Sequence, residues 1–145
     1  MWISLRTLSS QLKLGHLTPN VIINASAYTS VDKAETDVDA AYLINESAVE
    51  VMANIAKDNN CRFLHVSTDF VFDGTSNLAY GVASSTKPIS VYGASKLAGE
   101  LAISKTYPEN SAIVRTSWLY STFGDNFVTN MLRLLTKKSG AWRSW

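Results

Sequence analysis

The sequence predicts an α/β fold with a doubly wound parallel sheet of about three strands and flanking helices. Two observations carry this prediction. Short, continuously apolar runs rich in β-branched residues alternate with longer segments of helical periodicity, and uninterrupted apolar strands are typical of parallel sheets covered by helices on both faces. The 145 residues are about the size of one domain, so we expect a single partial domain over residues 1–145.

Three segments are expected to be strands. Val21–Ala25 reads VIINA and follows Thr-Pro-Asn, Cys61–Ser67 reads CRFLHVS, and Ser111–Ser117 reads SAIVRTS. Each is short and apolar, which fits a buried strand better than a helix. Cys61 is the chain's single cysteine, so no intramolecular disulfide can form, and a small buried thiol is expected.

Helices are expected between and after these strands. They cover Ala40–Lys57, with Thr36 or Asp37 as cap, Ser90–Lys105 and Asn126–Lys138, and a loop runs from Thr68 to about Pro88. In the first helix the apolar positions that trace one face are Ala41, Ile44, Ala48, Val51, Met52 and Ile55.

Polar residues gather where the predicted strands end. They are Asn24–Thr29, Ser67–Asp69 and Thr116–Trp118. Right-handed crossovers place the carboxyl ends of parallel strands at one edge of a sheet, and ligands bind outside that edge. At any one strand end, hydroxyls that cap helices or close turns explain such residues equally well. Three such ends together favour a site.

Tyr92 and Lys96 are four positions apart in the helix between the last two strands, so they share a face. A tyrosine can protonate the alkoxide formed when a ketone accepts hydride, provided its pKa falls toward neutrality. A nearby lysine ammonium lowers that pKa by favouring the phenolate. A hydroxyl beside the same carbonyl orients it, and Thr68 is the natural candidate, with Ser67 a weaker one. By itself Tyr-x-x-x-Lys is a weak signal, because a tyrosine beside a lysine is often a packing accident.

Long motifs occur here in a familiar order. PNVIINASAYTSVDKAE, HVSTDFVFDG, PISVYGASKLAGE and VRTSWLYSTFGDNFVTNMLRLL resemble the extended short-chain dehydrogenase/reductases, and within them the dTDP-4-dehydrorhamnose reductases, over about residues 19–135. The resemblance implies a partial Rossmann-like NAD(P)-binding domain. It also implies an oxidoreductase of dTDP-rhamnose biosynthesis that uses NADPH or NADH to reduce the 4-keto group of dTDP-4-dehydro-L-rhamnose to dTDP-L-rhamnose.

The resemblance also implies residue roles. Tyr92 would donate the proton, Lys96 would assist it and hold the nicotinamide ribose, and Thr68 would complete the catalytic triad. The dTDP-sugar would contact Thr68, Tyr92 and two further residues, Asp69 and Trp118. Besides Tyr92 and Lys96, the residues lining the cofactor would be Ala27, Tyr28, Thr29 and Val66.

The sequence departs from this family in several places. No G-x-G-x-x-G turn, which would hold the cofactor pyrophosphate, occurs in it. Phe70 stands where an aromatic hydroxyl is common, and YGVASSTKP lacks the usual acidic residues. We therefore expect a fragment without the family's first strands and last substrate segments, and with Val21–Ala25 as an exposed apolar edge. A non-catalytic relative of the type that regulates methionine adenosyltransferase, or an inactive fragment, remains the alternative function.

The composition limits the classes of partner that the chain is expected to bind. The formal net charge is +1, which gives no electrostatic reason for binding nucleic acid or an anionic membrane. No apolar run reaches the roughly 18 residues needed to span a bilayer, so the expected location is the cytoplasm. His16 and His65 are the two histidines, and no metal site is expected because no ligand cluster has metal spacing. A homodimer is left open.

Overall fold

The computed structural model describes residues 19–124 and 126–138. They divide into two compact units, one up to Arg115 and one from Thr116 onward. In the first unit, strands β1 (Val21–Asn24), β2 (Arg62–Thr68) and β3 (Ser111–Thr116) form a sheet of order β1-β2-β3. Strand β1 pairs in parallel with β2, from Val21 opposite Arg62 to Asn24 opposite His65. The predicted fold class is confirmed.

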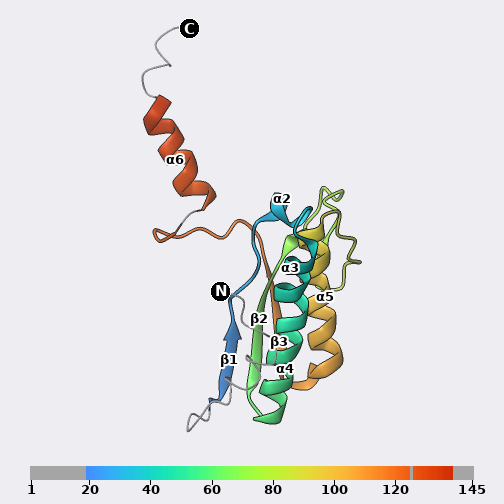
Figure 1. The fold of residues 1–145 in the computed structure, drawn as a ribbon. Coiled ribbons are helices and arrows are strands. Elements are labelled where there is room, and N and C mark those ends of the chain that lie inside the picture. The colour runs from blue at the N-terminus through green and yellow to red at the C-terminus, as the bar shows by residue number, and fades with distance from the viewer. Residues whose placement is uncertain (1–18, 125, 139–145) are drawn as a thin grey trace. The chain divides into compact units, whose positions relative to one another are not determined.

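Helices connect the strands and lie along the sheet (Figure 1). Between β1 and β2 come α2 (Val31–Ala34), α3 (Val38–Tyr42), the π-helical turn η1 (Leu43–Ser47) and α4 (Ala48–Asp58). Between β2 and β3 come the 3₁₀ turn η2 (Asp69–Val71), α5 (Val91–Thr106) and the 3₁₀ turn η3 (Pro108–Asn110). The helix predicted over residues 40–57 therefore exists, but a π turn interrupts it.

The buried face of this interrupted helix differs from the predicted one. Its buried residues are Ala41, Asn45, Val49, Ala53 and Ala56. Ala41 was predicted, whereas Ile44 is 40% exposed. The π turn holds an extra residue, which rotates the face that follows it. Small side chains line that face because α5 comes very near: a β-carbon on Gly99 would overlap the carbonyl oxygen of Asn45.

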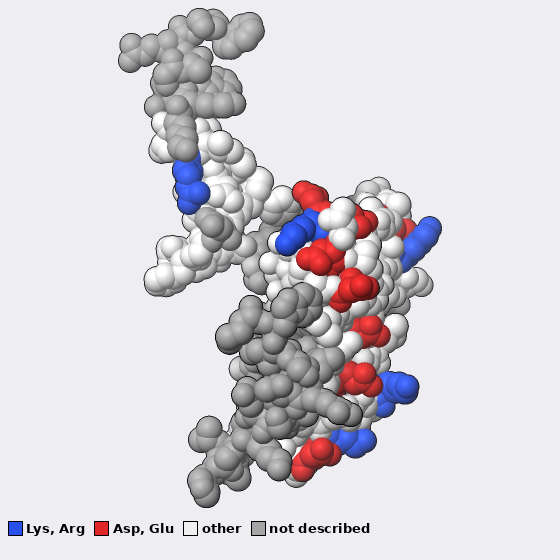
Figure 2. All heavy atoms as spheres, viewed as in Figure 1, with Lys and Arg blue, Asp and Glu red and all other residues white. Residues whose placement is uncertain are grey.

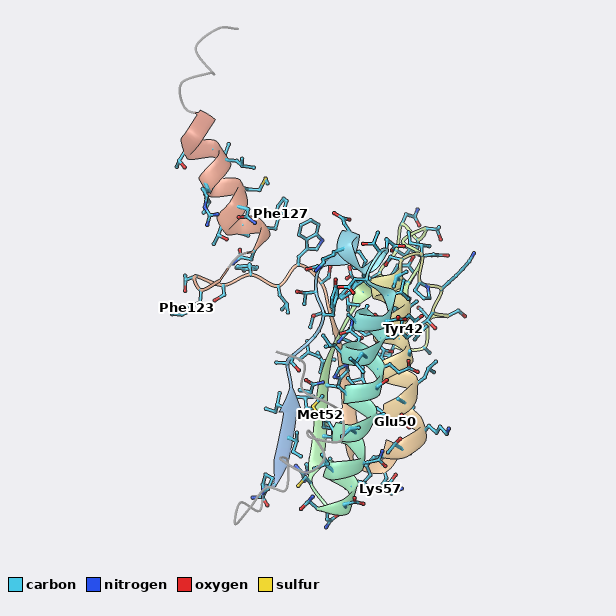
Figure 3. All side chains as sticks on the ribbon, viewed as in Figure 1. Tyr42, Glu50, Met52, Lys57, Phe123 and Phe127 are labelled. Carbon is cyan, nitrogen blue, oxygen red and sulfur yellow. The ribbon has the colours of Figure 1, made fainter. Side chains whose placement is uncertain are left out.

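The core lies between the helices and one face of the sheet. It consists of Val49, Ala53, Ala56, Cys61, Phe63, Ile103 and Tyr107, with Ile22, Met52 and Ile113 packed against it. Along β2, Phe63, His65 and Ser67 are buried and alternate with less buried residues. Figure 3 shows Met52 on the sheet side of α4, whereas Glu50 and Lys57 project from the helix surface. The buried Cys61 thiol, which donates to the Pro19 carbonyl at 2.9 Å, was predicted.

The opposite face of the sheet is open in the described part of the first unit. Val21, Ile23 and Val114 are exposed, Ile23 by 62%. The expectation that helices cover both faces is therefore met on one face only within residues 19–115. As predicted, β1 is an edge strand of the described sheet and exposes Val21 and Ile23, whereas Ile22 packs against the core and Asn24 is buried.

Acidic side chains form a row over the helices of the first unit, with lysines and arginines beside it (Figure 2). Exposed members of α2, α3 and α4 include Asp32, Asp39, Glu50 and Asp58. None of the helices described here is both long and apolar enough to cross a membrane.

The second unit contains helix α6 (Phe127–Lys138), within the predicted range 126–138. The rings of Trp118 and Phe127 pack edge to face with centroids 4.6 Å apart. Phe123 and Phe127, both labelled in Figure 3, are exposed.

Candidate active site

Thr68 ends β2 and starts the turn η2. Its hydroxyl oxygen accepts a hydrogen bond from the Phe70 backbone N–H at 3.2 Å, and its hydroxyl lies 3.2 Å from the Asp69 carboxylate. The side chain is buried. Capping the turn thus fixes the hydroxyl at the carboxyl edge of the sheet, where the sequence predicted a site.

Tyr92 lies in the first turn of α5, against η2. Ser90 caps the helix by accepting from the Gly93 N–H at 3.1 Å. A β-carbon on Gly93 would overlap the Phe70 carbonyl oxygen, so only glycine lets the helix start so close to η2. The rings of Phe70 and Tyr92 pack edge to face with centroids 5.5 Å apart. These contacts bring Tyr92 to the Thr68 side chain.

The pKa of Tyr92 is raised above its ordinary value. Burial is the main cause, and the charge of Asp69 adds to it, whereas a hydrogen bond with the Thr68 side chain lowers the pKa. The expected fall of the Tyr92 pKa toward neutrality is therefore wrong for this structure, because desolvation penalises the phenolate. That Lys96 favours the phenolate stays a prediction.

Lys96 lies one turn further along α5 and is only 2% exposed. Its amine donates to the Val66 carbonyl at 2.7 Å and lies 3.2 Å from Nε2 of His65. Burial lowers the pKa of Lys96 to about 8, although the charge of Glu100 acts in the opposite direction. Since the amine binds β2, two of the predicted cofactor residues, Lys96 and Val66, lie in contact.

The segment after β1 carries Ala27, Tyr28 and Thr29, the predicted cofactor residues. Asn45 holds the Tyr28 backbone, since its side-chain oxygen accepts from the Tyr28 N–H at 2.9 Å and its amide donates to the Tyr28 carbonyl at 3.2 Å. The same amide donates to Ser95 of α5 at 3.0 Å. Asn45 therefore ties this segment to the helix of Tyr92 and Lys96.

Sequence reasoning did not single out Asn45, and the structure shows why it is there. It lies in the π turn η1 and is 1% exposed. A π turn in an α-helix is frequent at functional sites. The signal in the sequence is an asparagine among the apolar positions of the predicted helix over residues 40–57.

Glu100 anchors the other end of the buried face of α5. Arg115 of β3 binds its carboxylate through two nitrogens, with the closer contact at 2.6 Å, and the Ser67 hydroxyl donates to it at 2.5 Å. Ser67 is therefore engaged with Glu100, which leaves Thr68 as the hydroxyl beside Tyr92. Trp118 belongs to the second unit, where its backbone φ is 53°.

A family model matches most of the chain. The RmlD substrate-binding domain matches residues 7–141. The chain belongs to the RmlD substrate-binding domain family. This assignment agrees with the resemblance that the four sequence motifs carry.

Several curated relatives of this RmlD-family chain are dTDP-4-dehydrorhamnose reductases. The one from Sinorhizobium fredii (strain NBRC 101917 / NGR234) is 47% identical over 116 residues, which are 80% of this chain and 39% of the relative. The one from Salmonella typhimurium is 43% identical over 122 residues, 84% of this chain and 40% of the relative. The chain thus spans about two fifths of the length of these relatives.

A solved structure shares the fold. The dTDP-4-dehydrorhamnose reductase from Bacillus anthracis, in complex with NADP, matches with a TM-score of 0.85 and 36% identity, over 92% of this chain and 47% of that one. It confirms the three-stranded α/β arrangement as part of a Rossmann-like fold.

Proposed function

We propose that this chain carries the catalytic segment of an NAD(P)H-dependent reductase that converts dTDP-4-dehydro-L-rhamnose to dTDP-L-rhamnose in the cytoplasm. One observation carries the proposal: Thr68, Tyr92 and Lys96 gather at the carboxyl edge of a parallel sheet. Tyr92 packs on Phe70 of the turn that Thr68 caps, and Lys96 lies one helical turn further along α5. The reductase names of the relatives, and the NADP in one of them, support the choice of substrate and cofactor.

The residues of the edge suit a nicotinamide ribose. Lys96 offers a buried amine and Tyr92 a half-buried hydroxyl, so both can donate to ribose hydroxyls. Ala27, Tyr28 and Thr29 would lie along the cofactor, in a backbone that Asn45 already holds. When bound, the reduced cofactor would supply the hydride.

The chain's own groups would handle the proton. Thr68 orients the substrate carbonyl and Tyr92 donates its phenolic proton to the oxygen that becomes an alkoxide. The raised pKa of Tyr92 keeps this proton in place until then. A charged Lys96 amine would stabilise the phenolate that remains. Asp69, next to Thr68, would contact the sugar nucleotide, and the predicted contact of Trp118, in the second unit, rests on the sequence motif alone.

Cofactor binding and turnover test this proposal together. The purified chain is titrated with NADPH and NADH by tryptophan quenching, and NADPH consumption is followed with dTDP-4-dehydro-L-rhamnose. We expect saturable binding that Lys96→Ala weakens, and turnover that Tyr92→Phe abolishes without loss of binding. Lys105→Ala and Tyr107→Phe, which change the same residue types on or just after α5, are the matched controls. Absence of cofactor binding at millimolar concentration would overturn the proposal for this chain.

A further inference from the structure

A chain of buried polar groups runs behind Lys96. The Ser26 backbone N–H and hydroxyl donate to Oδ1 of Asn24 at 3.0 and 2.8 Å. Nδ2 of Asn24 lies 3.0 Å from Nδ1 of His65, whose Nε2 lies 3.2 Å from Nζ of Lys96. Asn24, His65 and Lys96 are 3%, 0% and 2% exposed. Within this chain of contacts, solvent has little access to the three side chains.

The first link fixes the orientation of the Asn24 amide. A backbone N–H can only donate, so the atom that faces the Ser26 N–H must be the amide oxygen. The amide nitrogen then faces His65 and donates to Nδ1. Nδ1 consequently carries no proton, and a neutral His65 must carry its proton on Nε2.

The contact between Nε2 of His65 and Nζ of Lys96 places the Nε2 proton against the lysine amine. An ammonium has three N–H donors and no acceptor, so the Nε2–H of His65 meets another donor when Lys96 is charged. A neutral amine has a lone pair that accepts the Nε2–H, and it can still donate to the Val66 carbonyl. We propose that Asn24 and His65 are positioning residues for Lys96. They keep the Lys96 amine against the Val66 carbonyl and lower the proton affinity of that amine, so that they set the pH at which Lys96 is charged.

The surrounding charges favour the ammonium form of Lys96 rather than the neutral amine. The groups near Lys96 are His65 on β2 and two residues of α5, Tyr92 and Glu100. Glu100 is paired with Arg115 on β3. Asp69 of η2 acts on Tyr92. Glu100 is the one charge in the described chain that shifts the Lys96 pKa, with none from α2, α3, η1 or α4, and it favours the ammonium. The pKa of Lys96 nevertheless falls to about 8, and that of His65 to about 4, chiefly through burial.

The inference deepens the proposed reductase and rests on it for its meaning. In the proposed mechanism a charged Lys96 stabilises the Tyr92 phenolate. The loss of the Lys96 proton would therefore end activity at alkaline pH. Asn24 and His65, which would touch neither substrate nor cofactor, would fix where that limit falls. Changing them would move the alkaline side of the pH profile, which a merely structural role would not do.

Nuclear magnetic resonance on the full chain tests the inference without any turnover. The tautomer of His65 is read from long-range ¹H–¹⁵N correlations of its ring; the sequence has two histidines, and His16→Gln identifies the signals of His65. The charge of Lys96 is read from its ¹³Cε and ¹⁵Nζ shifts against pH, with Lys96→Met for assignment. We expect the Nε2–H tautomer of neutral His65 and a Lys96 amine that titrates well below the ordinary lysine pKa of about 10.4.

Two variants sharpen the test. Asn24→Asp keeps the acceptor for Ser26 but demands a proton on Nδ1, so the tautomer should switch and the proton affinity of Lys96 should rise more than about tenfold. His65→Gln offers a neutral carbonyl acceptor and should raise that affinity about tenfold. Asn54→Asp adds the same charge at an exposed position of α4 and should change neither readout.

Three results would overturn the inference, whatever the reductase assay gives. They are an Nδ1–H tautomer of His65 in the unmodified chain, a Lys96 that titrates at the ordinary lysine pKa of about 10.4, and a Lys96 titration unaltered in a folded His65→Gln chain. The first result needs no substitution in the buried chain of groups, so the test stands even where the variants fail to fold.

Discussion

Helix α5 buries two charged side chains one turn apart, and the protein treats them differently. Glu100 is paired with Arg115 through two nitrogens and also accepts from Ser67, so its charge is fully matched. Lys96 has no carboxylate partner among its described contacts and meets a carbonyl and an imidazole instead. A matched buried charge serves to connect elements, whereas an unmatched one has a shifted pKa, which is typical of functional sites.

Removing the partner of Glu100 should have the largest effect on stability. Arg115→Met leaves a nearly buried carboxylate without its cation, and we expect the free energy of unfolding to fall by about 3 kcal/mol. Denaturant unfolding measures this change. Lys33→Met, which removes the cation of the exposed pair Lys33–Asp37, is the control and should change stability little. Equal losses in both variants would show that burial does not distinguish the two pairs.

The second prediction concerns the pH dependence of stability that His65 causes. Its folded pKa of about 4 lies below the ordinary 6.5, so below pH 6.5 the unfolded chain takes up a proton that the folded chain refuses. Stability contributed by neutral His65 is therefore full above pH 6.5 and is lost as pH falls toward 4. The loss should reach about 3 kcal/mol. Unfolding curves at several pH values measure it; His65→Gln should flatten this window, and His16→Gln should leave it in place.

Lys96 should behave in the opposite way to Arg115. Its lowered pKa means that the fold disfavours the ammonium, so Lys96→Met removes an unmatched charge and fills a similar volume. We expect the free energy of unfolding to rise by about 1 kcal/mol, while NADPH binding is weakened. Thermal unfolding and cofactor titration of the same sample measure both. Loss of both stability and NADPH binding in Lys96→Met would show that Lys96 has a structural role like that of Glu100 and Arg115.

The surroundings of Glu100 and Lys96 also show how much of the site could be predicted from the sequence. The strands, the helix of Tyr92 and Lys96, and the site edge follow from local apolar patterns and the order of elements, which depend on neighbouring residues. The partners of Lys96 could not be predicted in this way, because they depend on the register that sets Asn24 beside His65. The π turn at Asn45 is likewise fixed by packing against Gly99, and it moved the buried helix face away from Ile44.

The smallest expected effect lies at the start of α5. Ser90→Ala removes the side chain that accepts from the Gly93 N–H, and the loss of such a cap costs about 1 kcal/mol of stability. Ser104→Ala, in the last turns of the same helix, removes an exposed hydroxyl that caps nothing and is the control. Denaturant unfolding compares the two variants.

The cap also separates the two ends of the site. Tyr92 depends on where α5 begins, so we expect Ser90→Ala to loosen its contact with Thr68 and lower turnover. Lys96 is held by β2, through Val66 and His65, so its titration should stay unchanged in the same variant. If Ser90→Ala also shifted the titration of Lys96, the protonation of Lys96 would depend on the start of α5 rather than on the sheet. The contrast between a lysine held by β2 and a tyrosine held by the helix N-terminus would then no longer hold.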